Sequence, residues 1–312
     1  MCIKERNASD STCKKLLRDK GCFADLCNYA FFQGRQVIQP EELVSRENDL
    51  STLIGKVDKP TEIKRYRDVV RKASIHGEYV IIGVEHQRTF DEKMIFRILN
   101  YDATIYINQV ESKQEIYPVG SFVFYTGDKE WKSPETLKET LKNIPPEMEP
   151  YINDWRLPVV ELKTMDARKL TNQRLKEVVE ISQSMFAGNY DGLRNNRKIE
   201  TENFMMAATF TRTKIKREDL PEGDEINMCE AMDKLFQRFE DQGMEKGETI
   251  GFEKGKREEK QNTLKDLLKV KLVTLSRPLE KQLTNTSLEK LNELTLNIFN
   301  VTSEEDVFRI IN

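Results

Sequence analysis

The sequence lacks the features that mark membrane, secreted and nucleotide-binding proteins. Its 312 residues contain no apolar run of 18 residues, whereas a helix needs about 20 to cross a bilayer. The first residues, MCIKERNASDSTCKK, include no apolar stretch, so we expect no signal peptide there. A P-loop, a dinucleotide-binding fingerprint and a Ser/His/Asp set are also missing. We therefore expect no membrane partner and no nucleotide site of a standard kind.

Cysteine and histidine are too few and too scattered to suggest a structural metal site. The cysteines number five, four of them within the first 27 residues, and the only histidines are His76 and His86. A structural zinc site needs about four ligands within tetrahedral reach. We therefore expect reduced thiols in a cytoplasmic protein.

Charge is nearly balanced, with 50 basic and 53 acidic side chains and a net charge of −3. Strong non-specific binding of nucleic acid usually needs a basic surface, so this balance argues weakly against it. Basic residues are nevertheless concentrated in one place. The segment KRYRDVVRK, residues 64–72, surrounds the single acid Asp68 with lysines and arginines.

Strand and helix patterns alternate along the first half of the chain, which predicts an α/β fold with a mixed central sheet flanked by helices. The run YVIIGVE is apolar on both faces, as in a strand that is covered on both sides. His76–Gly77–Glu78 would form the tight turn before it. We expect helices over 20–38 and 90–108, and strands over 66–73, 79–85, 121–125 and 157–162.

The second half is helical in pattern and suggests three parts: a domain over 1–225, a charged helix over 226–262 and a small helical C-terminal segment over 263–312. Four glycines recur every fourth residue in the charged helix, at Gly243, Gly247, Gly251 and Gly255. Each costs about 1 kcal/mol relative to alanine in a helix. One interpretation is close helix–helix contact, giving a homo-oligomer; the other is a solvated linking helix.

Glu85, Gln87 and Asp68 form the constellation that carries chemistry. Residues i and i+2 of a strand point to the same side, so Glu85 and Gln87 share a face at the polar end of YVIIGVE, and His86 points away from them. Asp68 lies 17 residues before Glu85, where a hairpin would bring it alongside. Mg²⁺ prefers oxygen ligands and is typically held by one or two carboxylates. These residues therefore predict a metal site for phosphodiester hydrolysis.

An ordered set of motifs resembles the Rpn family, the recombination-promoting nucleases and putative transposases of the PD-(D/E)XK superfamily. The set consists of RYRDVV with Asp68, VIIGVEHQ with Glu85 and Gln87, and FRILNY with Arg97 and Tyr101. Further similarity covers most of the chain, through FADLCNYAFFQGRQVIQPEEL, PVGSFVFYTGDKEW, INMCEAM, the glycine-repeat helix and the leucine-bearing tail.

The resemblance implies a restriction-endonuclease-like core with a helical C-terminal extension, and a DNA endonuclease that uses Mg²⁺ or Mn²⁺. Asp68 and Glu85 would be metal ligands, with the carbonyl of His86 as a third, and Gln87 stands where the superfamily commonly has lysine. An amide can orient water or phosphate but cannot supply a positive charge. The DNA contacts implied are Arg65, Arg67, Arg71, Arg97 and Tyr101. Asp25 is the best-placed candidate for the acid that the superfamily carries on its first helix.

Three alternatives remain open. Glu161-Leu162-Lys163 is a literal (D/E)XK at the end of LPVVEL, but its upstream acids, Asp128 and Asp154, are poorly placed, so we rank it second. Asp68 and Glu85 could also be surface carboxylates paired with Arg65, Arg67 or Arg71, since such pairs are common. Finally, the chain could be a weak or inactive relative that serves in DNA binding or self-assembly.

Overall fold

The computed structural model describes residues 3–44, 69–113 and 115–311. The chain divides into two compact units, Met1–Lys234 and Leu235–Asn312. Each unit is described by itself.

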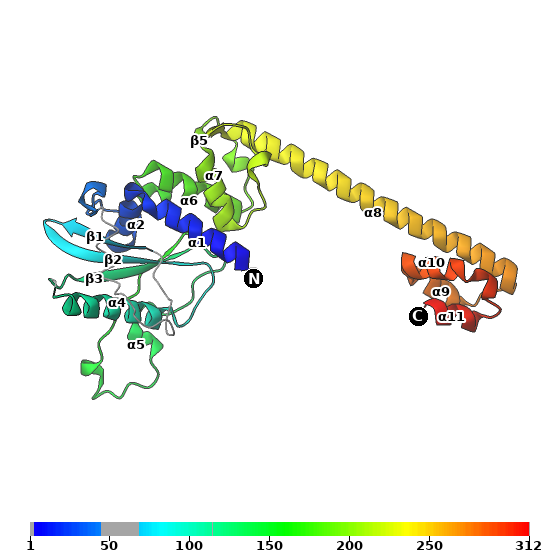
Figure 1. Ribbon diagram of the computed structural model, residues 1–312, viewed down its shortest axis with the longest axis horizontal. Coiled ribbons are helices and arrows are strands. Elements are labelled where there is room, and N and C mark those ends of the chain that lie inside the picture. Colours follow the sequence, from blue (N-terminus) through cyan, green and yellow to red (C-terminus); the bar gives the residue numbers. More distant parts are fainter. Residues whose placement is uncertain (1–2, 45–68, 114, 312) are drawn as a thin grey trace. The chain divides into compact units, whose positions relative to one another are not determined.

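A four-stranded mixed sheet forms the centre of the first unit, in the order β1-β2-β3-β4 (Figure 1). The strands are β1 Val69–Ile75, β2 Glu78–Gln87, β3 Val119–Tyr125 and β4 Val159–Glu161. β1 and β2 are an antiparallel hairpin, whose turn residues His76 and Gly77 have φ angles of 52° and 87°, as a two-residue hairpin turn requires. β2, β3 and β4 are parallel. Their carboxyl ends therefore meet at one edge of the sheet.

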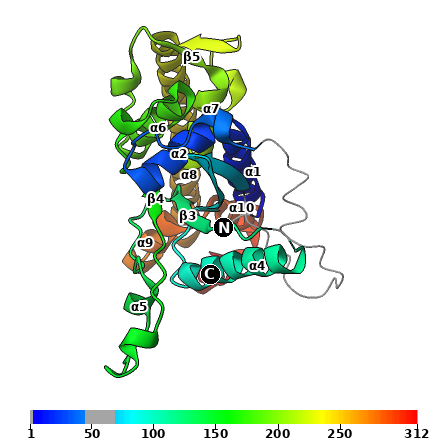
Figure 2. The same cartoon turned by 90° about the vertical axis from the view of Figure 1, so that its left-hand side faces the viewer.

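Helices cover both faces of this sheet, which confirms the predicted fold class (Figures 1 and 2). α4, Met94–Glu111, makes the crossover from β2 to β3 and covers one face. The other face is covered by α1 Ile3–Arg18, α2 Lys20–Phe32, α6 Gln173–Phe186 and α7 Thr201–Thr211. Parallel strands need such a crossover.

β2 is apolar on both faces because each face enters a different core. Ile82 and Val84 pack in the larger core with residues of α1, α2, α6 and α7. Ile81 packs on the opposite side against Ile105 of α4. The run YVIIGVE is therefore the covered strand that its composition predicts.

The first helices differ in extent from the prediction. α2 ends at Phe32 rather than at residue 38, because Gln33 adopts a left-handed conformation with φ 58°. The side chain of Asn28 then accepts hydrogen bonds from the backbone N–H groups of Val37 and Ile38, at 3.2 and 2.9 Å. α1 was not predicted at all, although Cys13, Leu16 and Leu17 have helical spacing and are fully buried.

The rest of the first unit consists of short elements. They are α5 Leu137–Thr140, the strand pair β5 Lys198–Glu200 and β6 Glu225–Asn227, and the 3-10 turns η1 Pro40–Glu42, η2 Glu149–Tyr151, η3 Ala167–Lys169, η4 Asp191–Leu193 and η5 Arg217–Asp219. The long helix α8, Met228–Leu272, has 45 residues; it begins in the first unit, and most of its residues belong to the second.

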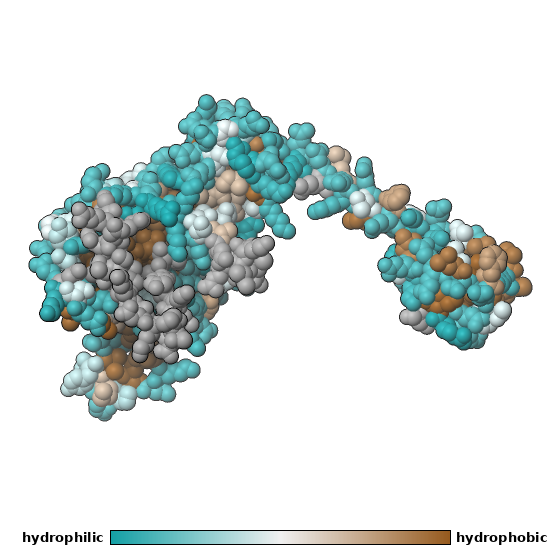
Figure 3. All heavy atoms as spheres, viewed as in Figure 1, coloured by the Kyte–Doolittle hydropathy of each residue, from teal (hydrophilic) through white to brown (hydrophobic). Residues whose placement is uncertain are grey.

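The second unit has its own core of leucines and other apolar residues, contributed by the end of α8 and by α9 Arg277–Asn285, α10 Leu288–Leu296, η6 Ile298–Asn300 and α11 Glu304–Ile311. This confirms the helical C-terminal extension. Apolar side chains also gather on the surface of this unit (Figure 3), where Val270, Val273, Leu296 and Phe299 are 82% to 89% exposed. Among the described residues, no helix has the length and apolarity that crossing a membrane requires.

Candidate active site

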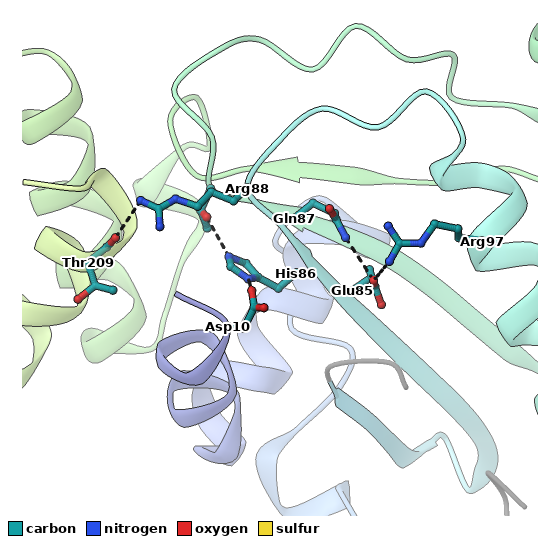
Figure 4. Close-up of polar contacts among 8 residues, drawn as sticks. Asp10, Glu85, His86, Gln87, Arg88, Arg97 and Thr209 are labelled. Carbon is teal, nitrogen blue, oxygen red and sulfur yellow. Dashed lines mark hydrogen bonds and ion pairs between the residues drawn. The ribbon is translucent and has the colours of Figure 1, made fainter. Parts of the chain in front are cut away.

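Glu85 and Gln87 lie side by side at the carboxyl end of β2, as the strand period predicts (Figure 4). Both side chains are on the face that α4 covers. Gln87 Nε2 donates to Glu85 Oε1 at 3.2 Å. The two residues are only 3% and 7% exposed. Glu85 is therefore a buried acid, and the alternative that makes it a surface carboxylate is wrong.

Arg97 approaches Glu85 from the first turns of α4. Its Nη2 lies 2.7 Å from Glu85 Oε1, and its Nη1 lies 3.0 Å from Asp91 Oδ2 in the loop before the helix. Burial lowers the pKa of the guanidinium, but hydrogen bonds with Tyr101 and Asp91 and the charge of Glu85 outweigh it, so the pKa lies above its ordinary value. The site thus contains a charged guanidinium in contact with a buried carboxylate.

Arg97 and Tyr101 were predicted from the sequence as DNA contacts, and the structure places Arg97 against Glu85 and Tyr101 against Arg97. The alternative that paired Glu85 with an arginine had named Arg65, Arg67 or Arg71 instead. Nothing in the strand pattern indicates that Arg97 would reach it, because this depends on which helix covers that face.

Asp68, Arg65 and Arg67 lie outside the residues that the structure describes. The residue that follows Asp68 in the chain, Val69, is described. It pairs with Val84, the residue before Glu85. Arg71 is on the opposite face of the sheet, where its Nη2 donates to the carbonyls of Leu17 and Arg18 at the end of α1, at 3.1 and 3.0 Å. Its contact with DNA stays a prediction.

His86 points away from Glu85, as predicted, into the core beneath α1 and α7. Its Nδ1 lies 3.0 Å from Asp10 Oδ1 of α1, and its Nε2 lies 2.9 Å from Thr126 Oγ1, just after β3. The ring packs beside Phe124 and Phe210. Both ring nitrogens therefore have partners, and the side chain connects α1 to the end of β3. These contacts were not predicted, because α1 itself was not predicted.

The competing motif is on the same face and edge as Glu85, two strands away. Gln87 is in register with Tyr125 of β3, which is in register with Glu161 of β4. The backbone N–H of Trp131 donates to Glu161 Oε2 at 3.2 Å. Burial, and the charges of Asp128 and Glu161, raise the pKa of Tyr125.

Lys163 does not accompany Glu161, because β4 ends at Glu161 and the chain turns. Its ammonium donates to the backbone carbonyl of Asp128 at 2.8 Å and lies 5.9 Å from the Phe186 ring centroid. The literal E-x-K is therefore not a pair of neighbouring side chains on one strand, which favours Glu85–Gln87.

Asp25 is a structural acid on the far side of the sheet. It is 2% exposed and accepts hydrogen bonds from the backbone N–H groups of Thr171 and Asn172, both at 2.9 Å, and from Gln36 Nε2 at 3.0 Å. It anchors the chain at the start of α6, away from Glu85.

The described residues do not by themselves form a metal site. In the described ranges, no three His, Cys, Asp or Glu side chains are grouped so that they could hold a metal ion. Glu85 and Gln87 do supply the carboxylate and amide oxygens that Mg²⁺ accepts as ligands. They fit one half of a two-carboxylate site, and the second carboxylate predicted for it is Asp68.

A comparison with known protein families gives a match over this sheet. Residues 61–210 match the model of the family described as Putative transposase, YhgA-like. This part of the chain is similar to that family. The match includes RYRDVV, VIIGVEHQ and FRILNY, and so confirms the resemblance that these motifs carry. No curated protein and no solved structure matches the chain.

The YhgA-like segment contains all four strands of the sheet, the crossover helix α4 and α6, and ends in α7. The family description names a putative transposase, a class of protein that acts on DNA. Glu85, Gln87, Arg97 and Tyr101 all lie inside the matched segment.

Proposed function

We propose that the chain is a metal-dependent DNA endonuclease of the mobile-element, recombination-promoting type, with its site at the carboxyl end of β2. The observation that carries the proposal is the buried pair of Glu85 and Gln87 with the partly exposed Arg97 against it. A carboxylate that is 3% exposed is costly to retain unless it is paired. Its position at the end of a parallel strand is where open α/β sheets bind their ligands.

Each side chain has a distinct task in this proposal. Glu85 and Asp68 would hold Mg²⁺ or Mn²⁺, with the carbonyl of His86 as a further ligand. When bound, the ion would neutralise phosphate charge and lower the pKa of the attacking water. Gln87 would orient that water or the phosphate through its amide.

Arg97 supplies the positive charge that Gln87 cannot. The raised pKa of its guanidinium keeps it charged, and it is partly exposed, at 23% of its side chain. It can therefore pair with the carboxylate of Glu85 and still face a phosphate. Asp91 and Tyr101 orient it from the loop and from the next turn of α4.

We also propose that this activity is cytoplasmic, in keeping with the described cysteines, all of which are free.

Plasmid nicking with Mg²⁺ or Mn²⁺ tests the proposal, with the wild type, Glu85→Ala and Glu161→Ala compared. We expect cleavage by the wild type and by Glu161→Ala, and a loss of at least about 100-fold in Glu85→Ala. Activity that is lost only in Glu161→Ala would move the site to β4. Activity that is unchanged in both would rule out a nuclease role for either motif.

A second function is favoured by the same contact. Arg97 already neutralises Glu85 at 2.7 Å, and Gln87 replaces the usual lysine, as expected of a relative that binds DNA or self-assembles without cleaving. Added Cβ atoms at Gly243, Gly247, Gly251 and Gly255 would meet nothing within 4 Å, so this stripe of α8 is open to a partner helix. DNA binding without metal-dependent cleavage by the wild type would support this second function.

A further inference from the structure

A small pocket lies at the same edge of the sheet as Glu85 but on the side of α7. Its volume is about 50 Å³, and its walls include Arg88, Thr126, Phe186, Phe210, Thr211 and Arg212. We call it the arginine pocket. One water needs roughly 10–15 Å³, so the pocket holds a few waters or one small oxyanion, and a nucleobase is too large for it.

The charges around the arginine pocket suit an anion. Arg88 and Arg212 both line it, and the only acid in its wall is Asp128, which is exposed. Lys163 adds a third cation beside it, since its ammonium lies 2.8 Å from the carbonyl of Asp128 and near the ring of Phe186. Guanidinium groups bind phosphate oxygens with good geometry, often through two parallel hydrogen bonds.

The pocket is also held in place by the fold. Arg88 is 8% exposed, and its Nη2 lies 3.4 Å from the carbonyl of Thr209 in α7. Thr126 is fixed by its hydrogen bond with His86 at 2.9 Å. Arg212 directly follows α7 as its C-terminal cap, with φ 59°. A guanidinium has five N–H donors, so Arg88 can contact α7 and an anion together.

The arginine pocket is connected to Glu85 through β2 itself. Arg88 follows directly after β2, and Figure 4 shows its side chain reaching towards α7 while Arg97 meets Glu85 on the other side. Three residues of extended chain span about 10 Å. A DNA strand advances 3.4 Å per nucleotide. Because the side chains of Glu85 and Arg88 extend to opposite faces of β2, the two sites are separated by at least about three such steps.

We infer that the arginine pocket binds a phosphate group of the DNA strand a few nucleotides away from the phosphate that is cleaved at Glu85. Arg88 and Arg212 would hold that group, and Thr126 would form the floor. The DNA strand would then be bound at two points near the carboxyl end of β2. The identity of the ligand as DNA rests on the proposed function, whereas the preference for an oxyanion rests on the pocket alone.

DNA binding by the full chain in EDTA tests this inference without cleavage. The affinity for a labelled duplex is measured by fluorescence anisotropy at several salt concentrations, for the wild type, Arg88→Gln and Arg212→Gln. Arg156→Gln is the matched control, because it removes one exposed arginine outside the pocket. We expect each pocket variant to weaken binding by about threefold to tenfold and to lower the salt slope by about 1. The control should change neither.

A second measurement uses sulfate or inorganic phosphate as the probe. Titration of the wild type should shift the backbone amide signal of Gly127 in a ¹H–¹⁵N spectrum, and the Arg212→Gln substitution should abolish this shift. Because Arg212 is exposed, we expect the variant to fold as the wild type does. Equal losses in the pocket variants and in Arg156→Gln, or no loss in any, would overturn the DNA assignment. A sulfate shift without arginine-dependent DNA binding would assign the pocket to a free phosphate-bearing ligand and contradict the inference.

The two proposals fail separately. If the wild type binds DNA through Arg88 and Arg212 but cleaves none with metal, the nuclease proposal fails and the pocket assignment stands. If it cleaves DNA with no effect of either arginine, the reverse holds.

Discussion

The contact between Arg97 and Glu85 dominates the site at the scale of single residues. The carboxylate is almost fully buried, and the guanidinium is about one-quarter exposed. Breaking a buried ion pair by removing one partner is costly because the remaining charge stays away from water. The same pair holds the loop at Asp91 against the sheet, since Arg97 contacts both acids.

We predict that Arg97→Leu lowers the free energy of unfolding by about 3 kcal/mol. The reason is that Glu85 would stay buried without the guanidinium that pairs with it. Urea denaturation of Arg97→Leu, Glu85→Gln and the double variant would measure this as a double-mutant cycle. The double variant should be more stable than Arg97→Leu alone. Equal stability of the wild type and Arg97→Leu would show that the pair is not a structural contact.

The sequence predicts part of this site for physical reasons that can be stated. Glu85 and Gln87 share a side because strand residues alternate. The position of Asp25 away from Glu85 was not predicted, because its hydrogen bonds with Thr171 and Asn172 are made across 146 and 147 residues. Pairings such as Glu85 with Arg97 and His86 with Asp10 depend on which helix covers which face. Periodicity within one element carries no information about that choice.

At the scale of elements, strands were easier to predict than helix ends. The apolar run of β2 and the turn at His76–Gly77 have local causes, so both were predicted close to their observed positions. α2 was predicted to extend to residue 38, but it ends at Phe32, since a left-handed residue and the side chain of Asn28 end it together. Such an end depends on a particular tertiary loop rather than on composition.

The glycine stripe of α8 gives a prediction at this scale. If the stripe is a contact surface, replacing both Gly247 and Gly251 with leucine should block close approach of a second helix and reduce the oligomer mass in light scattering. The double replacement of Glu245 and Thr249 with leucine is the matched control, because these residues have the same spacing on a different face and are also exposed. An unchanged mass in the glycine variant would leave α8 as a solvated linking helix.

The whole molecule consists of two units with separate cores. Both tryptophans, Trp131 and Trp155, lie in the first unit. Tryptophan fluorescence therefore reports on that unit alone, whereas far-ultraviolet circular dichroism reports on the helices of both.

We predict that Leu291→Ala destabilises only the second unit. Leu291 is fully buried in the C-terminal core, and its truncation should cost roughly 3 kcal/mol there. In urea, the dichroism transition should gain an early phase, while the fluorescence midpoint stays where it is in the wild type. Equal shifts of both probes would show that the two units unfold as one cooperative body.

Glu85 and Gln87 face α4, while His86 between them faces α1, so one strand carries two sets of side chains in strict alternation. The register of β2 therefore decides which core each of its side chains enters. Losing or gaining a single residue within it would exchange the two sets, placing the acid in the aromatic core and the imidazole under α4. We conclude that β2 can evolve by substitution far more readily than by a change of length.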